Sequence, residues 1–432
     1  MPTTRACSGT MVRQAGTAQA LARHSCRCHV MKVVIIGAGI VGVSAALTLT
    51  ERGVDVVVLE RGAVAREASG LNAGIIGGGG WGDRPDIDDV LRMGSLERYI
   101  DLSKMHGANI GLDQTGTLTL IRTEDEWNWA KATVDGDRRA GHCYELVTSS
   151  ELVGLEPAVD PQLLGAILDP LGARAEPVAA CRAFVAEAIA GGATIETDCP
   201  VTALAAVVGG GWEVSTPKKV FGADAVIIAA GPWCAQIGAM VGVDVPIVSV
   251  RGQMWASAPQ PLVLRHAIAA AESSRAWSAE QTDGHTPPHL THAVDGRVTR
   301  HLYGRQRPNG EIIFGGDRVL TADRKVDDTG IAVNHGHVGE LLPMVRCLSI
   351  ERTWAGAMPF SRDGRPLIGA VPWLQGLFVA GGLASGGFGR GPMTGQLVSD
   401  LVMGMETGFD LTMVLPDDRF MAVDSRANPA SN

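Results

Sequence analysis

A βαβ pattern near the start of the chain constrains its fold more than any other feature. An apolar run leads into Gly37, Gly39 and Gly42, which are spaced as G-x-G-x-x-G and open a helix-like run of small residues. A second apolar run ends at Glu60. In this order the glycines permit a tight turn, a close approach of backbone to a pyrophosphate, and close packing of helix on strand. The unit predicts a site for an adenine dinucleotide. Glu60 favours FAD or NAD, because an acid there accepts hydrogen bonds from a ribose and repels a 2′-phosphate.

Composition sets the outer limits of what the chain can be. With 432 residues it is too long for one compact core, which indicates two or three domains. A hydrophobic share of 46% and a charged share of 19% are typical of a folded chain. The net charge of −9 argues against nucleic acid or an anionic membrane as a partner. We expect no transmembrane segment, because no apolar run reaches the length of about 20 residues that spans a bilayer.

The eight cysteines are scattered and show no paired C-x-x-C spacing. Most lie in apolar segments, where a free thiol behaves as a small hydrophobic side chain. This favours a reducing, cytoplasmic location. The stretch Cys26-Arg-Cys28-His29 has no second pair of ligands at zinc spacing, so we expect no metal there.

The first 30 residues differ in composition from the rest. They carry four arginines, no Asp or Glu, and no apolar run of the secretory type. Such a composition is compatible with a transit peptide. We favour a disordered or non-native leader over residues 1–30, because the first predicted strand begins directly after Met31.

Periodicity and turn residues predict the remaining elements. Helices are expected over 87–106 and 178–190, and strands over 115–121, 194–198, 212–216, 225–231, 311–314 and 377–381, the last of the chain. Residues 256–300 show no clear pattern, and we expect His266, His292 and His301 at the surface rather than as bases. A glycine loop leads into an amphipathic helix over 393–403, whose N-terminus near Pro392 could stabilise negative charge on a cofactor ring.

Further motifs follow the nucleotide unit in a fixed order. They are Glu60-Arg61, Ala68-Ser-Gly-Leu-Asn-Ala-Gly74, Thr115-Gly-Thr-Leu118, Gly154-Leu-Glu-Pro157, Arg251-Gly-Gln253, Tyr303-Gly-Arg-Gln306 through Gly316, Arg352-Thr-Trp-Ala-Gly356, Asp363-Gly-Arg-Pro-Leu-Ile-Gly369 and the glycine loop to Gly395. In this order they resemble the FAD-dependent amine and amino-acid oxidoreductases, the family of D-amino-acid oxidase, glycine oxidase and sarcosine oxidase or dehydrogenase. The resemblance covers residues 31–408.

The resemblance implies an α/β fold with a Rossmann-type, three-layer FAD-binding domain and a substrate domain built on a mixed sheet. The FAD-binding domain would be assembled from residues 31–105, 165–245 and 345–415, and the substrate domain from 106–164 and 246–344. Residues 416–432 would form a C-terminal tail. Some members of the family attach FAD covalently through a His near the Ser69 motif or a Cys near the terminal glycine loop. This chain has neither residue at those places, so the resemblance implies noncovalent FAD.

The motifs also imply which residues hold FAD. The first glycine turn would bind the pyrophosphate, Glu60 the AMP ribose, Val201 the adenine, and the segments around Ser69 and Gly387 the flavin ring. The residues expected at the cofactor are Gly37, Gly39, Ile40, Val41, Gly42, Glu60, Arg61, Ser69, Asn72, Ala73, Gly74, Val201, Gly231, Trp233, Gly386, Gly387, Phe388, Gly389 and Thr394.

The implied reaction removes hydride from the α-carbon of an amino acid or secondary amine to flavin N5. The imine that remains is hydrolysed by water. D-amino acids, glycine and N-methyl glycine are substrates of the expected type. Arg305 or Arg307 would bind a substrate carboxylate, and Tyr303 and Trp354 would wall the pocket. The structural alternatives are ion pairs for the arginines and core packing for the aromatic residues.

Two other functions remain open on sequence grounds. The chain could be the flavin-binding subunit of a multi-subunit amine or proline/hydroxyproline dehydrogenase complex, which passes electrons to a partner, or a dinucleotide-binding protein without catalysis. Homo-oligomers are equally compatible with the sequence. Some oxidase members carry a Lys in the strand where Ile312 and Ile313 stand, so this chain leans toward a dehydrogenase.

Overall fold

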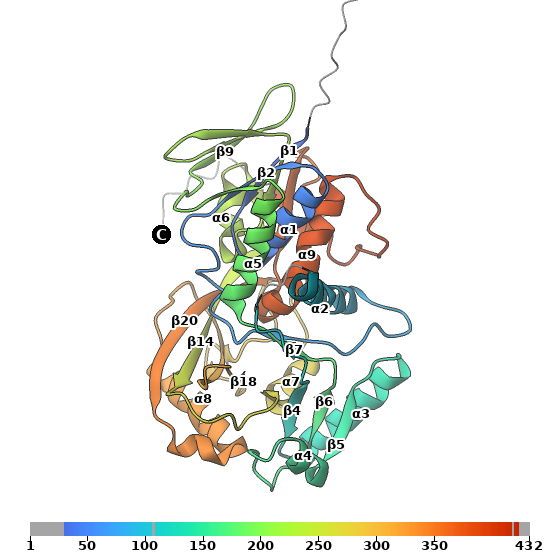
Figure 1. Cartoon of the computed structure of the whole chain (residues 1–432), viewed down its shortest axis with the longest axis vertical. Helices are drawn as coiled ribbons and strands as arrows, with labels where there is room; N and C mark the ends of the chain where they lie inside the picture. Colours follow the sequence, from blue (N-terminus) through green and yellow to red (C-terminus); the bar gives the residue numbers. More distant parts are fainter. Residues whose placement is uncertain (1–29, 106–108, 417–418, 423–432) are drawn as a thin grey trace, which may run out of the picture. The chain divides into compact units, whose positions relative to one another are not determined.

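The computed structural model describes residues 30–105, 109–416 and 419–422 (Figure 1). The expectations for the leader over 1–29, for Cys26 to His29 and for most of the tail lie outside these residues. None of the helices in the described ranges combines the length and apolarity needed to cross a bilayer. The cysteines in these ranges are free thiols, namely Cys143, Cys181, Cys199, Cys234 and Cys347.

A six-stranded sheet carries the predicted nucleotide unit. Its strand order is β21-β22-β12-β1-β2-β8, and every neighbour is parallel except β21. In chain order the strands are β1 (Lys32–Ile36), β2 (Asp55–Leu59), β8 (Thr194–Glu196), β12 (Ala225–Ile228), β21 (Leu367–Ala370) and β22 (Leu377–Gly381). Segments far apart in sequence therefore form one sheet.

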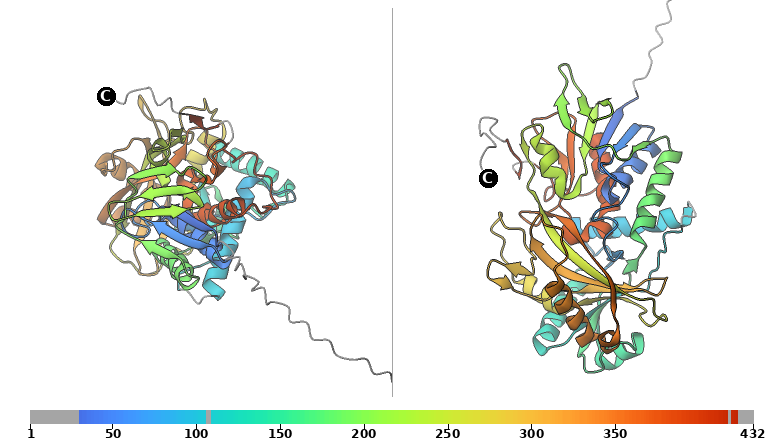
Figure 2. Two further views of the ribbon diagram at one scale, coloured as in Figure 1. Left: turned by 90° about the horizontal axis from the view of Figure 1, so that it is seen from above. Right: turned by 90° about the vertical axis from the view of Figure 1, so that its left-hand side faces the viewer.

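Alternating side chains of β1 explain why this sheet is covered on both faces. Val33 and Ile35 pack against helices, which are α1 (Ile40–Glu51), α2 (Ile87–Met105), α5 (Pro177–Ala190) and α9 (Gly387–Val402). Val34 and Ile36 pack on the other face, against α6 (Cys234–Ala239) and an antiparallel sheet of β9 (Ala203–Ala206), β10 (Trp212–Ser215) and β11 (Val220–Ala223). The arrangement in Figures 1 and 2 confirms the α/β prediction.

A larger, mixed sheet occupies the lower half of Figure 1. Its order is β20-β14-β19-β18-β15-β4-β6-β5. The strands are β4 (Thr117–Ile121), β5 (Glu145–Thr148), β6 (Gly165–Asp169), β14 (Ile247–Ser257), β15 (Ala267–Ala270), β18 (Tyr303–Gln306), β19 (Ile312–Leu320) and β20 (Ile350–Ser361). β6 and β20 pair in this sheet, whereas the sequence prediction assigned both strands to the FAD-binding domain.

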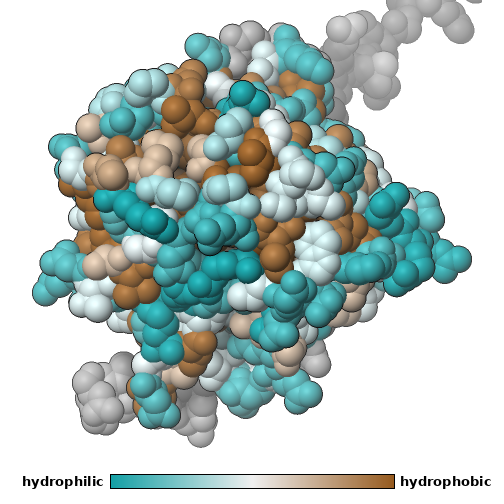
Figure 3. All heavy atoms as spheres, turned by 90° about the horizontal axis from the view of Figure 1, so that it is seen from below, coloured by the Kyte–Doolittle hydropathy of each residue, from teal (hydrophilic) through white to brown (hydrophobic). Residues whose placement is uncertain are grey.

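Short elements complete the description. The helices beside the larger sheet are α3 (Glu124–Arg139), α4 (Ser149–Leu155), α7 (Ala271–Ser278) and α8 (Asp328–Leu341), and the 3-10 turns are η1 (Gly231–Trp233), η2 (Pro343–Cys347) and η3 (Ala384–Gly386). Three strand pairs are β3 (Ile75–Ile76) with β7 (Ala173–Arg174), β13 (Val243–Asp244) with β23 (Met421–Ala422), and β16 (His292–Ala293) with β17 (Gly296–Arg297). On the face in Figure 3, hydrophilic and hydrophobic side chains are interspersed.

The predicted C-terminal helix begins earlier than expected. It starts at Gly387 and contains Pro392, so the expectation of an N-terminus near Pro392 was wrong. Proline has no N–H for the carbonyl four residues earlier. That carbonyl, of Phe388, instead accepts a hydrogen bond from the Tyr99 hydroxyl at 2.9 Å. The Tyr99 side chain, on α2, thus replaces the missing helical bond.

The strand over 377–381 was expected to be the last of the chain. In the structure β23 follows it, so β22 is not the last strand.

Candidate functional site

One cavity runs from the carboxyl ends of β1, β2, β12 and β22 to the face of the larger sheet. Ligands of parallel α/β sheets bind at such strand ends. The cavity is lined by fifteen of the residues expected at the site: Gly37, Gly39, Ile40, Val41, Glu60, Arg61, Ser69, Asn72, Val201, Gly231, Trp233, Tyr303, Trp354, Gly387 and Phe388. It is not lined by Gly42, Ala73, Gly74, Arg305, Arg307, Gly386, Gly389 or Thr394.

The first turn of α1 forms the narrow end of the cavity. Gly37 has a φ of +112°, which side chains rarely adopt. A Cβ atom on Gly42 would overlap the carbonyl oxygen of Gly37, so the helix can follow the strand this closely only with glycine there. The backbone N–H of Ile40 donates to Ser69 Oγ at 3.0 Å. Helices leave their first N–H groups without internal acceptors, and those of Gly39 and Val41 lie at the cavity, where they suit a phosphate.

Glu60 lies directly after β2 and closes this end. Its Oε2 accepts from the backbone N–H of Ala38 at 2.9 Å, and its Oε1 accepts from that of Gly62 at 2.8 Å. Each carboxylate oxygen has a further lone pair, so the group can also accept from the hydroxyls of a ribose. The adjacent Arg61 stacks on Trp233, with its Cζ 3.5 Å from the ring centroid.

The segment 68–74 is held in place by hydrogen bonds of the Asn72 side-chain amide and by one hydrogen bond from the larger sheet. The Asn72 side chain donates to the carbonyls of Ala68 and Ser69 at 2.9 and 3.0 Å and accepts from Gly74 N at 2.7 Å. The indole N–H of Trp354 donates to Leu71 O at 2.9 Å. This segment forms one wall of the cavity, and the Trp354 bond ties that wall to the larger sheet.

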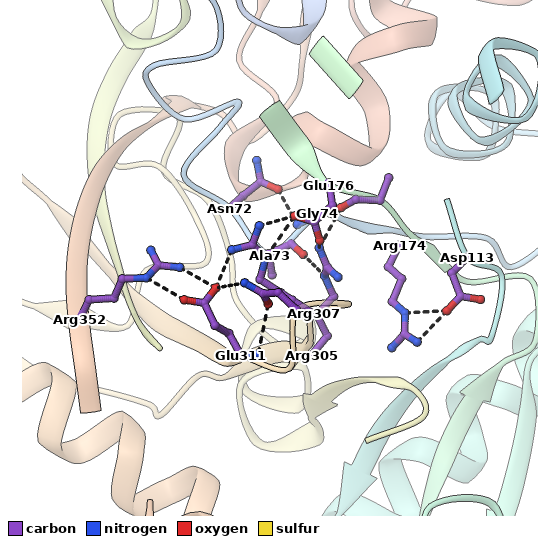
Figure 4. A network of polar contacts seen from close by, with 12 residues as sticks. Asn72, Ala73, Gly74, Asp113, Arg174, Glu176, Arg305, Arg307, Glu311 and Arg352 are labelled. Carbon is purple, nitrogen blue, oxygen red and sulfur yellow. Dashed lines mark hydrogen bonds and ion pairs between the residues drawn. The ribbon is translucent and has the colours of Figure 1, made fainter. Parts of the chain in front are cut away.

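Arg305 and Arg307 belong to an ion-pair network beside this segment (Figure 4). The Arg305 side chain is 1% exposed; it donates to Ala73 O through Nε and to Glu176 Oε1 at 2.7 Å through Nη2. Arg307 pairs with Glu176 and with Glu311, the latter at 2.7 Å. Burial alone would raise the pKa of Glu176, but hydrogen bonds from both arginines lower it. Both guanidinium groups are occupied away from the cavity, so this geometry does not support their expected role as carboxylate clamps.

The wide end of the cavity is mostly apolar. Tyr303 and Trp354 face it as expected, and Met254 packs with them and with Ile313. Gly387 brings the first turn of α9 to the same end, where the helix dipole favours negative charge. The wide end therefore combines apolar walls with one positive backbone terminus.

Thr394 does not reach the cavity, contrary to expectation. It is fully buried in α9, and its hydroxyl donates to Arg390 O at 2.9 Å. His266 was expected at the surface but is buried, with Nδ1 3.1 Å from Glu156 Oε2. Glu156 lies 110 residues from His266 in the sequence, so the local sequence gives no sign of this contact.

Several lining residues had no assigned role on sequence grounds. They include Leu71, Gln253, Met254, Met358, Leu383, Ala384 and Ser385. The Arg251-Gly-Gln253 motif was the available signal for β14, and the glycine loop was the signal for Ser385. Within the described ranges, no cluster of three or more His, Cys, Asp or Glu side chains could hold a metal ion.

Comparisons with known proteins agree with this geometry. The family model described as FAD dependent oxidoreductase matches residues 32–401. Glycine oxidase of Geobacillus kaustophilus is 28% identical over 389 residues, covering 89% of this chain and 96% of the relative. Mitochondrial dimethylglycine dehydrogenase of Mus musculus is 25% identical over 400 residues, covering 89% of this chain but 44% of the longer mouse protein.

Solved structures show the same fold. The crystal structure of glycine oxidase from Geobacillus kaustophilus superimposes with a TM-score of 0.75 and 25% identity, covering 88% of this chain and 97% of that one. L-proline dehydrogenase from P. horikoshii superimposes with a TM-score of 0.72 and 24% identity, covering 88% and 95% of the two chains.

Proposed function

The chain belongs to the family of FAD-dependent oxidoreductases, and from this premise we propose that it oxidises an amino acid or a secondary amine at the α-carbon. The observation that carries the proposal is a single cavity with two different ends. The narrow end offers the first-turn N–H groups of α1 and the Glu60 carboxylate, and the wide end offers apolar walls on the larger sheet.

The residues present fit FAD. The first turn of α1 would hold the pyrophosphate, and glycine is favoured at Gly39 because a Cβ there would lie 3.0 Å from Ser69 Oγ, a tight contact. Glu60 would hold the ribose diol, and Val201 lines the cavity beyond it, where adenine would lie. The N-terminus of α9 would face the electron-rich edge of the ring. When bound, FAD supplies the hydride acceptor for the oxidation.

The chain's own contribution to the reaction is position and exclusion of water. Tyr303, Trp354 and Met254 would hold the neutral amine in an apolar pocket. Loss of the α-hydrogen as hydride leaves an imine, which water hydrolyses to a carbonyl product and an amine. No base is needed at the carbon. His301 cannot supply a charge there, because burial lowers its pKa well below the usual range.

Purified holoenzyme tests the proposal. Acid should release a yellow chromophore that matches FAD, and anaerobic addition of amino acids and N-methyl amines should bleach the bound flavin with at least one of them. The product should be the keto acid or aldehyde with ammonia or an alkylamine. A protein that stays colourless after incubation with FAD, or a flavin that no member of the panel reduces, would refute the proposal.

We also propose that the electron acceptor is a molecule other than oxygen. The β19 strand presents Ile313 to the cluster around Met254 and Tyr303, with no basic side chain at this position to assist oxygen. After anaerobic reduction, reoxidation by a dye such as dichlorophenolindophenol should be faster than by air-saturated buffer. Rapid peroxide formation under air would identify an oxidase instead. A cytoplasmic location, homo-oligomers and an electron-accepting partner remain predictions.

A further inference from the structure

Arg318, on β19, has no carboxylate partner within ion-pair distance in the described part of the chain. Its guanidinium donates to three neutral acceptors: Ser385 Oγ at 2.7 Å, His301 Nε2 at 3.3 Å and His289 O at 3.3 Å. Its Nε is buried without a hydrogen-bond partner there. Burial is the main cause that lowers the pKa of Arg318 to about 10, so the side chain is charged at neutral pH.

A β-bulge sets the direction of this side chain. The pairing of β14 with β19 shifts between Arg251, opposite Val319, and Gln253, opposite Gly316, so that Asp317 and Arg318 lie opposite one residue. Asp317 has a φ of +62°, an uncommon value for a residue other than glycine. Bulges next to active sites re-aim side chains in this way.

Two side chains hold the bulge in its strained conformation. Gln253 Nε2 donates to Asp317 Oδ2 at 2.6 Å, and Arg297 pairs with the other carboxylate oxygen. Backbone strain that the surrounding structure maintains is found at functional sites more often than elsewhere. The Asp317 carboxylate is therefore occupied by Gln253 and Arg297. The charge of Glu280 also acts on Arg318, but within the described ranges Glu280 forms no ion pair with it and instead accepts from the backbone N–H of His289.

Arg318 lies next to the wide end of the cavity. Its hydrogen-bond partner Ser385 lines that end, as does Tyr303. Burial raises the pKa of the Tyr303 phenol, and the nearby charge of Arg318 partly offsets this rise. The Trp277 ring supports the guanidinium, with Arg318 Cζ 4.1 Å from its centroid. A cation that has neutral hydrogen-bond partners but no carboxylate is thus held beside the expected position of the substrate.

We propose that Arg318 binds the carboxylate of the substrate and makes the enzyme selective for amino acids over simple amines. A guanidinium binds a carboxylate with paired, charge-assisted hydrogen bonds. A buried charge is costly without a counter-charge, which a substrate carboxylate supplies. Arg305 and Arg307 already have Glu176 and Glu311 as partners. The inference rests on the proposed function for its substrate, but its binding step can be tested without turnover.

The first experiment titrates oxidised holoenzyme with acetate and with benzoate while the flavin absorbance is followed. The wild-type protein should show a saturable spectral change, and Arg318→Met should weaken binding by about tenfold or more, as expected when a hydrogen bond to a charged group is lost. Arg318→Lys should give an intermediate affinity, because it keeps the charge but not the paired N–H donors of the guanidinium. An equal response to chloride at the same ionic strength would contradict a carboxylate site.

The matched control is Arg275→Met. Arg275 lies on α7 near Trp277 but is exposed and paired with Asp125 at 3.0 Å. This variant should bind acetate as the wild type does. Unchanged acetate affinity in Arg318→Met would overturn the proposal. If that variant does not fold with FAD bound, Arg318→Lys and Ser385→Ala decide, and wild-type affinity in both would also overturn it.

The second experiment compares amines with and without a carboxylate. Sarcosine and dimethylamine, D-alanine and ethylamine, and proline and pyrrolidine are matched pairs for anaerobic flavin reduction. The wild type should prefer the amino acid in the pair that it accepts. Arg318→Met should lose most of that preference, because the apparent dissociation constant of the amino acid should rise while that of the amine should not. Wild-type preference retained in Arg318→Met would contradict the proposal. If no compound reduces the flavin, the proposed function fails, while the acetate titration still decides the role of Arg318.

Discussion

The two ends of the cavity are built in opposite ways. At the narrow end, the backbone N–H groups, Glu60 and Ser69 come from one continuous stretch of fewer than 40 residues, and the bonded partners lie 2, 22 and 29 positions apart. At the wide end, Met254, Tyr303, Trp354 and Ser385 come from four separate elements. A shared cofactor can be bound by a local motif, whereas a particular substrate is selected by side chains that only the tertiary fold brings together.

The largest effect is expected from a substitution that disrupts the narrow end of the cavity. Gly42→Ala places a Cβ atom against the Gly37 carbonyl oxygen, so the turn must open and the FAD site is lost. We expect protein that is purified without flavin and shows no measurable FAD binding by fluorescence quenching. Gly336→Ala is the control, because nothing lies within 4 Å of a Cβ there. Normal FAD content in Gly42→Ala would show that the close packing of α1 on the turn is not required.

The next largest effect is expected from Arg305, which connects β18 of the larger sheet to the segment 68–74. Arg305→Met leaves Glu176 with one partner fewer and removes the bond to Ala73 O in the segment 68–74. Loss of one partner from a buried pair costs about 3–5 kcal/mol of unfolding free energy. Arg307→Met, at a side chain 29% exposed, should cost about 1 kcal/mol. Urea unfolding measures both. Equal losses would mean that the two arginines do not differ as their burial suggests.

A smaller effect is expected from the acid of the narrow end. Glu60→Gln must direct its amide NH₂ toward either Ala38 N–H or Gly62 N–H, which both donate to the carboxylate. We expect FAD to bind about tenfold more weakly, because a hydrogen bond to a charged group is worth about 1.5–3 kcal/mol. Glu213→Gln, at an exposed residue of β10, should bind FAD normally. Unchanged FAD affinity in Glu60→Gln would contradict the proposal that Glu60 binds the ribose.

The smallest effect tests the network beside the wide end through pH. Burial alone would raise the pKa of Glu311, but hydrogen bonds from Arg352 and Asn309 and the charge of Arg307 help to lower it to about 2. A carboxylate whose pKa is lower in the folded state stabilises the fold above the unfolded value of about 4.3. This stabilisation is lost as the pH falls toward 2.

Glu311→Gln measures that contribution directly. The variant should be about 1 kcal/mol less stable than the wild type at pH 7, a typical value for an accessible ion pair. The difference should shrink as the pH falls from about 5 toward 2. Chemical unfolding at a series of pH values follows it. A difference that stays constant over this range would show that the ionised carboxylate is not what stabilises the network.

Sequence reasoning succeeded where the determining contacts are local. The strand, turn, helix and acid from Lys32 to Glu60 interact with neighbours that the pattern itself contains. It did not identify the Glu176 partner of Arg305, because this acid lies 129 residues away and nothing near the arginine indicates it. Arg318 was missed for the converse reason. Its lack of a carboxylate partner is a property of its surroundings and cannot be read from its neighbours in sequence.

The early start of α9 shows a different limit. Its first residues include several glycines, which have low helix propensity and therefore predicted a loop. In the fold these glycines allow close contact between helices. A Cβ at Gly391 would lie 2.6 Å from Ile40 Cγ2, and one at Gly395 would lie 2.7 Å from Ala45 N. Packing against α1 therefore outweighs propensity, and the same contact brings Gly387 to the cavity.

Anaerobic stopped-flow reduction of the holoenzyme by an α-deuterated amino acid tests the central claim, that both ends of the cavity serve one oxidation at the α-carbon. The substrate would be the compound that bleaches the flavin fastest. We expect a limiting rate of flavin reduction several-fold lower than with the protiated compound. Reduction at the same limiting rate with both isotopes would contradict the account, as would a flavin that none of the amino acids or amines reduces.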